Sequence, residues 1–277
     1  MKIVFFTFYF PPDLSAGSFR SVAFSKSLKE KLKPGDKIDI ITSHPNRYKA
    51  HLIEAQDIEF DEMITIHRIN VPSHTGSMFS QGYAFLIFAI SAFNLCRKIK
   101  PDFLIGTSSR LMTATLTWIS ASYLKKRYFI DLRDIFSETI SDIFMQKNRL
   151  LGLITKHFFI KLEKYVLNSA AGVNVVSEGF PEYFENNGID TSNWFFFPNG
   201  VDHNFVDFPA QKTGLKKSIK TILYAGNIGK GQGLEKVIPV IAKSLGFEYQ
   251  IKIIGDGGAI SLLRDLINKE NIQNVEL

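Results

Sequence analysis

Short runs of apolar, β-branched and aromatic residues alternate along this chain with longer stretches whose apolar residues recur at helical spacing. The runs cover 2–8, 36–42, 64–69, 102–106, 127–131, 172–176, 221–225 and 250–254. The helical stretches cover 18–32, 79–98, 111–123, 150–167, 234–245 and 260–269. Continuous apolar strands joined through helices indicate a parallel sheet covered on both faces, with right-handed crossovers. The predicted fold class is therefore α/β.

A change in composition near residue 200 divides this pattern into two parts. A Pro-Asn-Gly turn at 198–200 follows an aromatic run, and a polar, lysine-rich stretch follows at 211–220. Such a stretch is typical of a linker. We predict an N-terminal domain over 1–200, a linker over 201–219 and a partial C-terminal domain over 220–277. The last part is short for a doubly wound domain, so we expect another segment or chain to complete it.

The net charge indicates which kinds of partner to expect, and the cysteine content indicates the redox compartment. The 277 residues include 33 Lys and Arg against 27 Asp and Glu, a formal net charge of +6. This mild excess suits anionic partners such as phosphates and acidic lipid headgroups without choosing among them. The single cysteine, Cys96, lies in an apolar run, which predicts a buried structural thiol and fits a reducing compartment.

Neither of the two most apolar segments is predicted to be a signal peptide or a membrane span. The apolar first strand runs into Pro11 and Pro12 without a cleavage site, which argues against a signal peptide. The longest apolar segment, 83–96, is shorter than the ~20 residues that cross a bilayer. We therefore expect a cytoplasmic protein, with peripheral contact to a membrane as the further expectation.

Metal chemistry and nucleic-acid recognition are not expected. The histidines show no metal-ligand spacing, and a lone cysteine excludes a thiolate zinc site. Basic clusters such as 125–127 lack the interleaved aromatic residues of an RNA-recognition motif. We predict no metal, no cofactor and no nucleic-acid partner.

The loop after the first strand carries a candidate anion site. Gly17 allows close backbone approach, Ser18 is a natural N-cap, and Arg20 adds positive charge in the first helical turn. Ligands of open parallel sheets bind at the carboxyl ends of strands, where this loop lies. The alternative is an ordinary connection between a strand and a helix.

Two glycine loops follow the strands of the C-terminal part. The first includes Gly226, Asn227, Gly229 and Lys230, and it suits a diphosphate held by backbone N–H groups and a lysine. It is neither a Walker A loop nor a dinucleotide fingerprint. The second loop consists of Gly255, Asp256 and Gly257. Because Gly-Asp-Gly is common in plain turns, it is the weaker signal.

Charged side chains gather at the end of the run at 127–131. Asp131, Arg133 and Asp134 place two carboxylates and a guanidinium within four residues, which suits acid–base work or hydroxyl binding. The alternative is a local ion pair that fixes the loop, with Asp134 capping the next helix.

The helical stretch at 150–167 combines apolar residues at helical spacing with Lys156, Lys161 and Lys164, and Glu163 is its sole acid. This composition allows contact with an anionic membrane surface. A core helix with a solvated basic face is the alternative.

Taken in order, six motifs resemble those of family 4 glycosyltransferases, in the bacterial branch that builds O-antigen, capsule and exopolysaccharide. They are FPP at 10–12 with Ala-Gly at 16–17, DLRD at 131–134, VSEGF at 176–180, PNGVD at 198–202, YAGNIG at 224–229 and IGDG at 254–257. The resemblance extends over essentially the whole chain. Each motif is modest, but the ordered set is specific.

The resemblance implies a GT-B architecture of two Rossmann-like domains and a retaining, metal-independent sugar transfer. The donor would be a nucleotide sugar, and the acceptor a glycan or a polyprenyl-linked sugar. Gly17 would lie near the donor phosphates, residues 131–134 would line the acceptor side, the loop at 226–233 would hold the diphosphate, and 255–257 would lie close to the nucleotide.

Two departures from the family pattern bear on activity. Asn227 stands where many members have arginine, and Gln232 where they have lysine, with Lys230 as a shifted substitute. The acidic motif that grips the donor ribose and sugar has no counterpart within 277 residues. An inactive remnant that binds nucleotide sugars and a GT-B sugar-nucleotide epimerase therefore remain the alternatives to a transferase.

Overall fold

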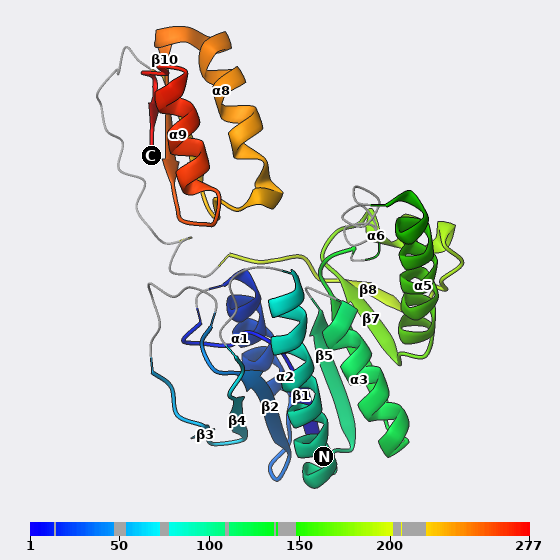
Figure 1. Cartoon of the computed structure of the whole chain (residues 1–277). Helices are drawn as coiled ribbons and strands as arrows, with labels where there is room; N and C mark the ends of the chain where they lie inside the picture. The colour runs from blue at the N-terminus through cyan, green and yellow to red at the C-terminus, as the bar shows by residue number, and fades with distance from the viewer. Residues whose placement is uncertain are drawn as a thin grey trace. The chain divides into compact units, whose positions relative to one another are not determined.

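The computed structural model describes residues 1–13, 15–46, 54–72, 78–108, 111–135, 137, 148–201, 206 and 220–277. The chain divides into two compact units, Met1–Val201 and Asp202–Leu277. Figure 1 shows the elements of both. The linker predicted at 201–219 lies almost wholly outside the described residues.

The first unit is built on an eight-stranded sheet in the order β3-β4-β2-β1-β5-β6-β7-β8. Its strands are β1 (Lys2–Phe6), β2 (Lys37–Ser43), β3 (Ile58–Asp61), β4 (Ile64–Ile69), β5 (Phe103–Ser108), β6 (Arg127–Leu132), β7 (Gly172–Val175) and β8 (Trp194–Phe196). All neighbouring pairs are parallel except β3 with β4. The α/β class and parallel sheet predicted from the sequence are confirmed.

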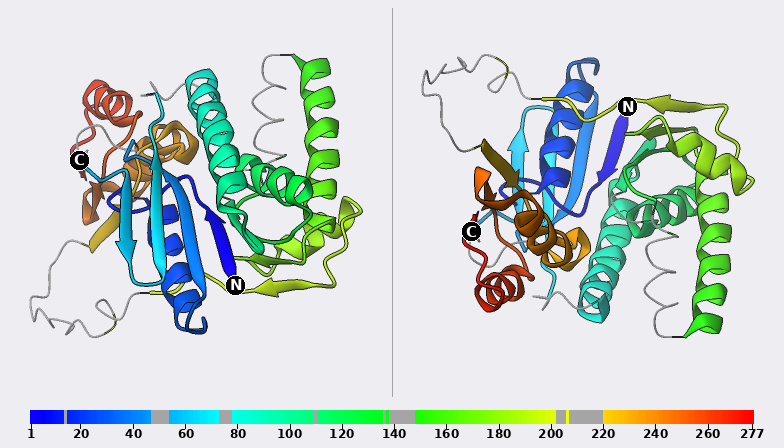
Figure 2. Two further views of the ribbon diagram at one scale, coloured as in Figure 1. Left: turned by 90° about the horizontal axis from the view of Figure 1, so that it is seen from below. Right: turned by 90° about the horizontal axis from the view of Figure 1, so that it is seen from above.

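Helices cover both faces of this sheet. In Figure 2, α1 (Ala16–Lys29) lies on one side, and α2 (Met78–Ile99), α3 (Leu111–Leu124) and α5 (Arg149–Asn168) lie on the other. The short helix α6 (Phe180–Asn186) adds Phe184 to the core on the side of α2 and α3. Apolar side chains of β1 alternate between these faces, since Val4 and Phe6 join that core and Ile3 and Phe5 join the one under α1.

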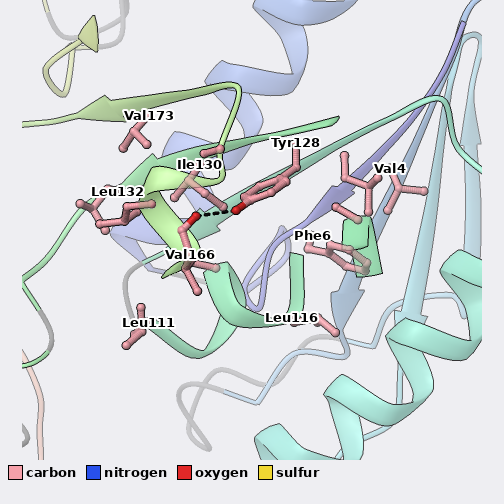
Figure 3. Close-up of a cluster of buried hydrophobic side chains, with 14 of the residues drawn as sticks. Val4, Phe6, Leu111, Leu116, Tyr128, Ile130, Leu132, Val166 and Val173 are labelled. Atoms are coloured by element: carbon pink, nitrogen blue, oxygen red, sulfur yellow. Dashed lines mark hydrogen bonds between the residues drawn. The ribbon is translucent and has the colours of Figure 1, made fainter. Parts of the chain in front are cut away.

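The larger core lies between the centre of the sheet and α2, α3 and α5. Figure 3 shows Val4, Phe6 and Ile130 from the strands with Leu111 and Leu116 from α3. Tyr128 is buried there, and its hydroxyl donates a hydrogen bond to the carbonyl oxygen of Val166 at 2.5 Å. Burial raises the pKa of the Tyr128 phenol. This bond ties β6 to the end of α5.

A row of serines lines the buried side of α1. Ser18, Ser21 and Ser25 are each no more than 2% exposed. The Ser21 hydroxyl lies 2.9 Å from the hydroxyl of Thr7, just beyond β1. The N-cap of α1 is Ser15, whose Oγ accepts a hydrogen bond from the Ser18 amide at 3.1 Å. The prediction that Ser18 caps this helix was therefore wrong: the helix begins at Ala16, two residues before the expected stretch 18–32, and its N-cap is three residues before Ser18.

The second unit holds a parallel three-stranded sheet in the order β11-β10-β9. Its elements are β9 (Lys220–Ala225), the 3₁₀ turn η2 (Lys230–Gln232), α8 (Leu234–Leu245), the 3₁₀ turn η3 (Gly246–Glu248), β10 (Tyr249–Ile254), α9 (Ile260–Lys269) and β11 (Val275–Glu276). Ile251 and Ile253 of β10 pack with apolar residues of α8 and α9 in one core. The start of a strand expected at 275–277 is present as β11.

Three elements of the first unit were not predicted. β3 is a short edge strand of mixed polarity, and its hairpin to β4 turns at Glu62, which has φ of 47°. β8 has three residues, in the aromatic run that precedes the predicted domain boundary, and α6 has seven. Such short elements carry too few periods for an alternation to be recognised.

Helix α2 is longer than the apolar segment 83–96 that the sequence suggested. Within the described residues, Ser80–Ile99 is the single stretch long and apolar enough to cross a membrane, judged by length and composition alone. Ala84, Phe88, Ala92 and Cys96 of this helix are fully buried in the core of the first unit. Their positions show that α2 packs against the sheet as a core helix.

The Cys96 thiol should resist alkylation as long as the chain is folded. Cys96 is fully buried, and desolvation raises its pKa to about 12. Thiolate, the reactive form, is therefore scarce near pH 8 and inaccessible. Mass spectrometry after iodoacetamide treatment should show little modification without denaturant and complete modification in urea. Rapid labelling of the folded chain would contradict this placement.

Candidate functional site

The carboxyl ends of β5, β6 and β7 meet around Asp131. Its carboxylate is 1% exposed. One oxygen accepts hydrogen bonds from Arg20 Nε at 2.8 Å and Thr107 Oγ1 at 3.1 Å. The other accepts from Arg20 Nη2 at 2.7 Å and Asn174 Nδ2 at 2.6 Å. Four donors therefore enclose a carboxylate that was predicted to be catalytic.

The guanidinium of Arg20 is likewise committed within the first unit. Beyond Asp131, it donates to the carbonyl of Phe197 at 3.1 Å and to Oδ1 of Asn199 at 3.0 Å. Asn174 also accepts the Phe197 amide at 2.8 Å. Arg20 was predicted to receive an anion, but here it joins α1 to β6 and to the chain that leaves β8. In this arrangement Arg20 and Asp131 hold α1, β6 and the chain that leaves β8 together, and their predicted roles in anion binding and catalysis stay predictions.

Arg133 and Gly17 bring the two predicted clusters of the first unit together. A Cβ placed on Gly17 would lie 3.0 Å from Arg133 Nη1, so the glycine leaves space for the guanidinium. The Arg133 Nε atom is buried and has no hydrogen-bond partner among the described residues. Burial lowers the pKa of Arg133, and the carboxylates of Asp131 and Asp134 act in the opposite direction. A half-buried cation beside a glycine at a helix start is suited to an anionic or hydroxyl-rich ligand.

The other two predicted site residues of this unit, Asp134 and Ser18, differ in whether a ligand can reach their side chains. Asp134 is exposed next to Arg133, so it can contact a ligand at the carboxyl edge of the sheet. Ser18 is fully buried, and its Oγ has no hydrogen-bond partner in the described part of the chain. Its side chain therefore cannot reach an anion in this structure.

In the second unit, the two glycine loops pack directly against each other. A Cβ on Gly255, which has φ of 157°, would lie 1.8 Å from the carbonyl oxygen of Gly226. A Cβ on Gly257 would lie 2.4 Å from the carbonyl oxygen of Ile228. Since β9 and β10 are parallel, both loops lie at the same edge of the sheet. The loops 226–229 and 255–257, which the sequence offered as two separate candidates, therefore lie side by side.

Several backbone amides of these loops already have partners inside the unit. Gly226 N donates to Ile254 O at 2.9 Å and Ile228 N to Asp256 O at 2.8 Å. Gly229 N donates to Gln232 Oε1 at 3.2 Å, and that oxygen also accepts from Asn227 Nδ2 at 3.0 Å. Gly257 N donates to Oδ1 of Asp256 at 2.7 Å.

In the first turn of α8, Lys236 N and Val237 N donate to the Gly233 carbonyl at 3.0 and 3.3 Å, so the amides of Leu234 and Glu235 are the candidate donors for a phosphate. Gly233 precedes that turn with φ of 63°. The side chain of Lys230 lies outside the described part of the structure, so its predicted role stays a prediction. The Gln232 side chain closes the loop in the place where family members carry lysine, and it would have to move before Gly229 N could bind a phosphate.

Sequence reasoning missed Thr107 and Asn174. Both lie on strands that are otherwise apolar, and Asn174 is 1% exposed. A buried amide in a continuous apolar strand needs hydrogen-bond partners, so Asn174 carried a signal that could have been used. Within the residues that the structure describes, no group of three or more His, Cys, Asp or Glu could hold a metal ion.

Comparison with known proteins finds a glycosyltransferase of similar sequence. No family model matches it. It is 25% identical over 200 residues to a protein named as a colanic acid biosynthesis glycosyl transferase, WcaI, of Escherichia coli strain K12. That alignment covers 68% of this chain and 49% of the relative, so the chain spans about half the length of the curated relative it matches.

Solved structures of low sequence identity share the fold. Sucrose-phosphate synthase from Thermosynechococcus elongatus matches with a TM-score of 0.69 and 13% identity, covering 99% of this chain and 69% of that one. Anabaena HepE, in complex with UDP and glucose, matches at 0.62 and 14% identity, covering 100% and 68%. The UDP-GlcNAc 2-epimerase of Neisseria meningitidis, bound to UDP-GlcNAc, matches at 0.57 and 13% identity, covering 100% and 72%.

These comparisons bear out the motif-based resemblance. The ordered motifs, the parallel sheet of each unit and the glycine loops at the strand ends agree with them. The chain is thus similar in sequence to a named glycosyltransferase, and it shares the GT-B fold of the solved neighbours, as the motif-based resemblance implied.

Proposed function

We propose that the chain takes part in a glycosyltransferase reaction that moves a sugar from a nucleotide-sugar donor to a lipid-linked or glycan acceptor in cell-surface polysaccharide synthesis. Support comes from the relative named for colanic acid biosynthesis and from the solved neighbours that hold UDP, glucose or UDP-GlcNAc. Because the chain spans 49% of that relative's length, the activity of a whole protein of this kind is part of the proposal.

The observation that carries the proposal is the pairing of the two glycine loops in the second unit. Their contact at Gly255 and Gly226 puts two strand ends and the start of α8 at one edge of a small parallel sheet. Nucleotide phosphates bind at this edge in open α/β sheets. The UDP-bound neighbours share this fold.

The proposed transfer is retaining and metal-independent. A nucleoside diphosphate leaves with negative charge, and donors that stabilise this charge lower the barrier. In this chain the donors would be the first amides of α8 and the ammonium of Lys230. In the first unit, Arg133 and Asp134 lie together at the carboxyl edge, where they would bind and orient acceptor hydroxyls.

The proposed place of action is the inner face of the cytoplasmic membrane, where a polyprenyl-linked acceptor is presented. The exposure of Leu150, Ile154 and Phe158 on α5 supports the expectation that 150–167 meets an anionic membrane surface. No cofactor and no nucleic acid take part in this proposal.

Replacing Asp134 by alanine in the full-length protein should reduce sugar transfer by about 100-fold, because an acceptor hydroxyl would lose a residue that orients it. The side chain is exposed, so the fold should be unchanged. Transfer of radiolabelled sugar to isolated membranes measures activity, and circular dichroism measures folding. Glu182→Ala, at an exposed acid on α6, is the matched control and should keep full activity. Near-normal activity of Asp134→Ala would remove this residue from the acceptor site.

Two further measurements separate the alternatives. An epimerase isomerises its donor without an acceptor, and NMR of UDP-GlcNAc incubated with the protein alone would detect the second isomer. The fold shared with the 2-epimerase favours including this test. Saturable nucleotide-sugar binding without transfer or isomerisation would instead support an inactive remnant.

A further inference from the structure

We propose that the outer surface of α2, α3 and α5 docks on an anionic lipid bilayer. This three-helix face is marked by exposed apolar side chains on each helix: Tyr83, Leu86 and Ile90 of α2, Tyr123 of α3, and Ile154 and Phe158 of α5. The sequence singled out only the region of α5. The proposal extends the membrane contact proposed for 150–167 to α2 and α3, and it requires no donor binding, so it can fail while the proposed sugar transfer stands.

The three helices form one continuous surface. They lie on the same side of the eight-stranded sheet, and α3 contacts both α2 and α5 (Figure 2). Tyr83 is 59% exposed, Ile90 55%, Tyr123 57% and Phe158 60%. Large apolar side chains of this kind do not usually gather on the surface of a soluble domain unless the surface binds something.

The opposite side of the sheet shows the contrast within the same unit. Helix α1 exposes one large apolar side chain, Phe19, near its start. Its remaining surface carries polar and charged residues such as Lys26 and Ser27. The gathering of exposed apolar residues is therefore a property of one face and not of every helix in this fold.

The charges of the three-helix face have one sign. Helices α2 and α3 contain no Asp or Glu. The single acid of α5, Glu163, is buried and accepts a hydrogen bond from the Ser137 amide at 3.2 Å. Lysine and arginine side chains accompany the apolar residues: Arg97 and Lys98 end α2, and Lys156, Lys161 and Lys164 lie along α5.

Arg97 places a positive charge directly beside aromatic side chains of this face. Its guanidinium lies 5.0 Å from the ring centre of Tyr123 and 5.8 Å from that of Phe93. An arginine held over aromatic rings at the rim of an apolar surface can bind a lipid phosphate while the rings enter the headgroup region.

This combination favours a lipid surface over a protein partner. Lysine is depleted from the cores of protein interfaces, whereas apolar helices with lysine along one side bind anionic membranes. A second copy of the chain would place the lysines of α5 against like charges. Exposed acids such as Glu182 and Glu185 lie on α6, which is not part of the three-helix face.

Vesicle sedimentation tests the proposal directly. The chain should bind vesicles of phosphatidylcholine mixed with phosphatidylglycerol, and bind vesicles of phosphatidylcholine alone far more weakly. The double variant Ile90→Glu/Phe158→Glu should weaken binding at least about tenfold, because two apolar contacts are lost and two negative charges are added. Val240→Glu, at a 62% exposed valine of α8 in the second unit, is the matched control and should bind normally.

A second variant covers the case in which the glutamates disturb folding. Lys161→Gln/Lys164→Gln changes two exposed side chains and should lower the affinity for anionic vesicles about fivefold per lysine. Equal affinity for both vesicle types, or anionic binding that neither double variant weakens, would overturn the proposal. So would self-association without lipid that Ile90→Glu/Phe158→Glu abolishes, because the occupant would then be a second copy.

Discussion

Replacing Gly255 by alanine should destabilise the second unit by about 2–4 kcal/mol, the sum of overpacking and backbone strain. A Cβ at this position would lie 1.8 Å from the carbonyl oxygen of Gly226, a backbone atom that cannot move as the end of a side chain can. Gly255 also has φ of 157°, which disfavours any side chain. The loops must therefore separate or the end of β10 must rotate.

Thermal unfolding followed by far-ultraviolet circular dichroism measures this effect. Gly258→Ala is the matched control, since it lies in the same loop and its Cβ would meet nothing within 4 Å. That variant should unfold at nearly the same temperature as the unsubstituted chain. If the two variants are equally stable, the loops do not make the close contact described here.

The Gly255 variant also tests the proposed donor site. Separation of the loops would displace the start of α8 from the ends of β9 and β10. Gly255→Ala should therefore lower the affinity for UDP, measured by calorimetry, as well as the stability. Gly258→Ala should retain UDP binding. Loss of stability with unchanged UDP affinity would place the nucleotide elsewhere.

Replacing Asp131 by alanine should cost about 3–5 kcal/mol of folding stability, the range for removing one partner of a buried ion pair. The carboxylate is 1% exposed, and the Arg20 side chain is 11% exposed. The variant leaves the Arg20 charge and the Asn174 amide without their acceptor. Urea unfolding of the whole chain measures the loss.

Two further variants give the Asp131 result a clear meaning. Removing the acid and the base together, as Arg20→Leu/Asp131→Leu, should be less destabilising than Asp131→Ala, because no buried charge remains unpaired. Glu276→Ala breaks an exposed ion pair with Lys252 and should change stability little. If Asp131→Ala is as stable as the parent but loses transfer, Asp131 acts in contact with substrate after all.

The sequence predicted the fold because its strands are continuous apolar runs and its helices are long. Both signals come from local periodicity, and β1, β4, β6, α8 and α9 begin at or next to the expected residues. The antiparallel β3 and the short β8 depend on pairing with neighbouring strands, which local periodicity does not report.

The position of the site was predictable, but its hydrogen bonds were not. Strand ends of a parallel sheet share an edge, and this rule alone brings Gly17 to Arg133 across more than one hundred residues of chain. The choice of Asp131 as the partner of Arg20, 111 residues away, depends on the direction of each side chain. A charged residue at a strand end can equally face a ligand or another charge, so the sequence left both roles open.

The row of serines on α1 determines how closely this helix packs on the sheet, and so where the site residues of the first unit lie. Because Ser18, Ser21 and Ser25 are small, the axis of α1 can lie close to the sheet, with the Ser21 and Thr7 hydroxyls in contact. Gly17 and Arg20 belong to the first turns of this helix, so the thickness of the buried layer fixes their distance from Arg133 and Asp131. The alignment of the loop with the strand ends is thus determined by the volume of three side chains that no ligand can touch.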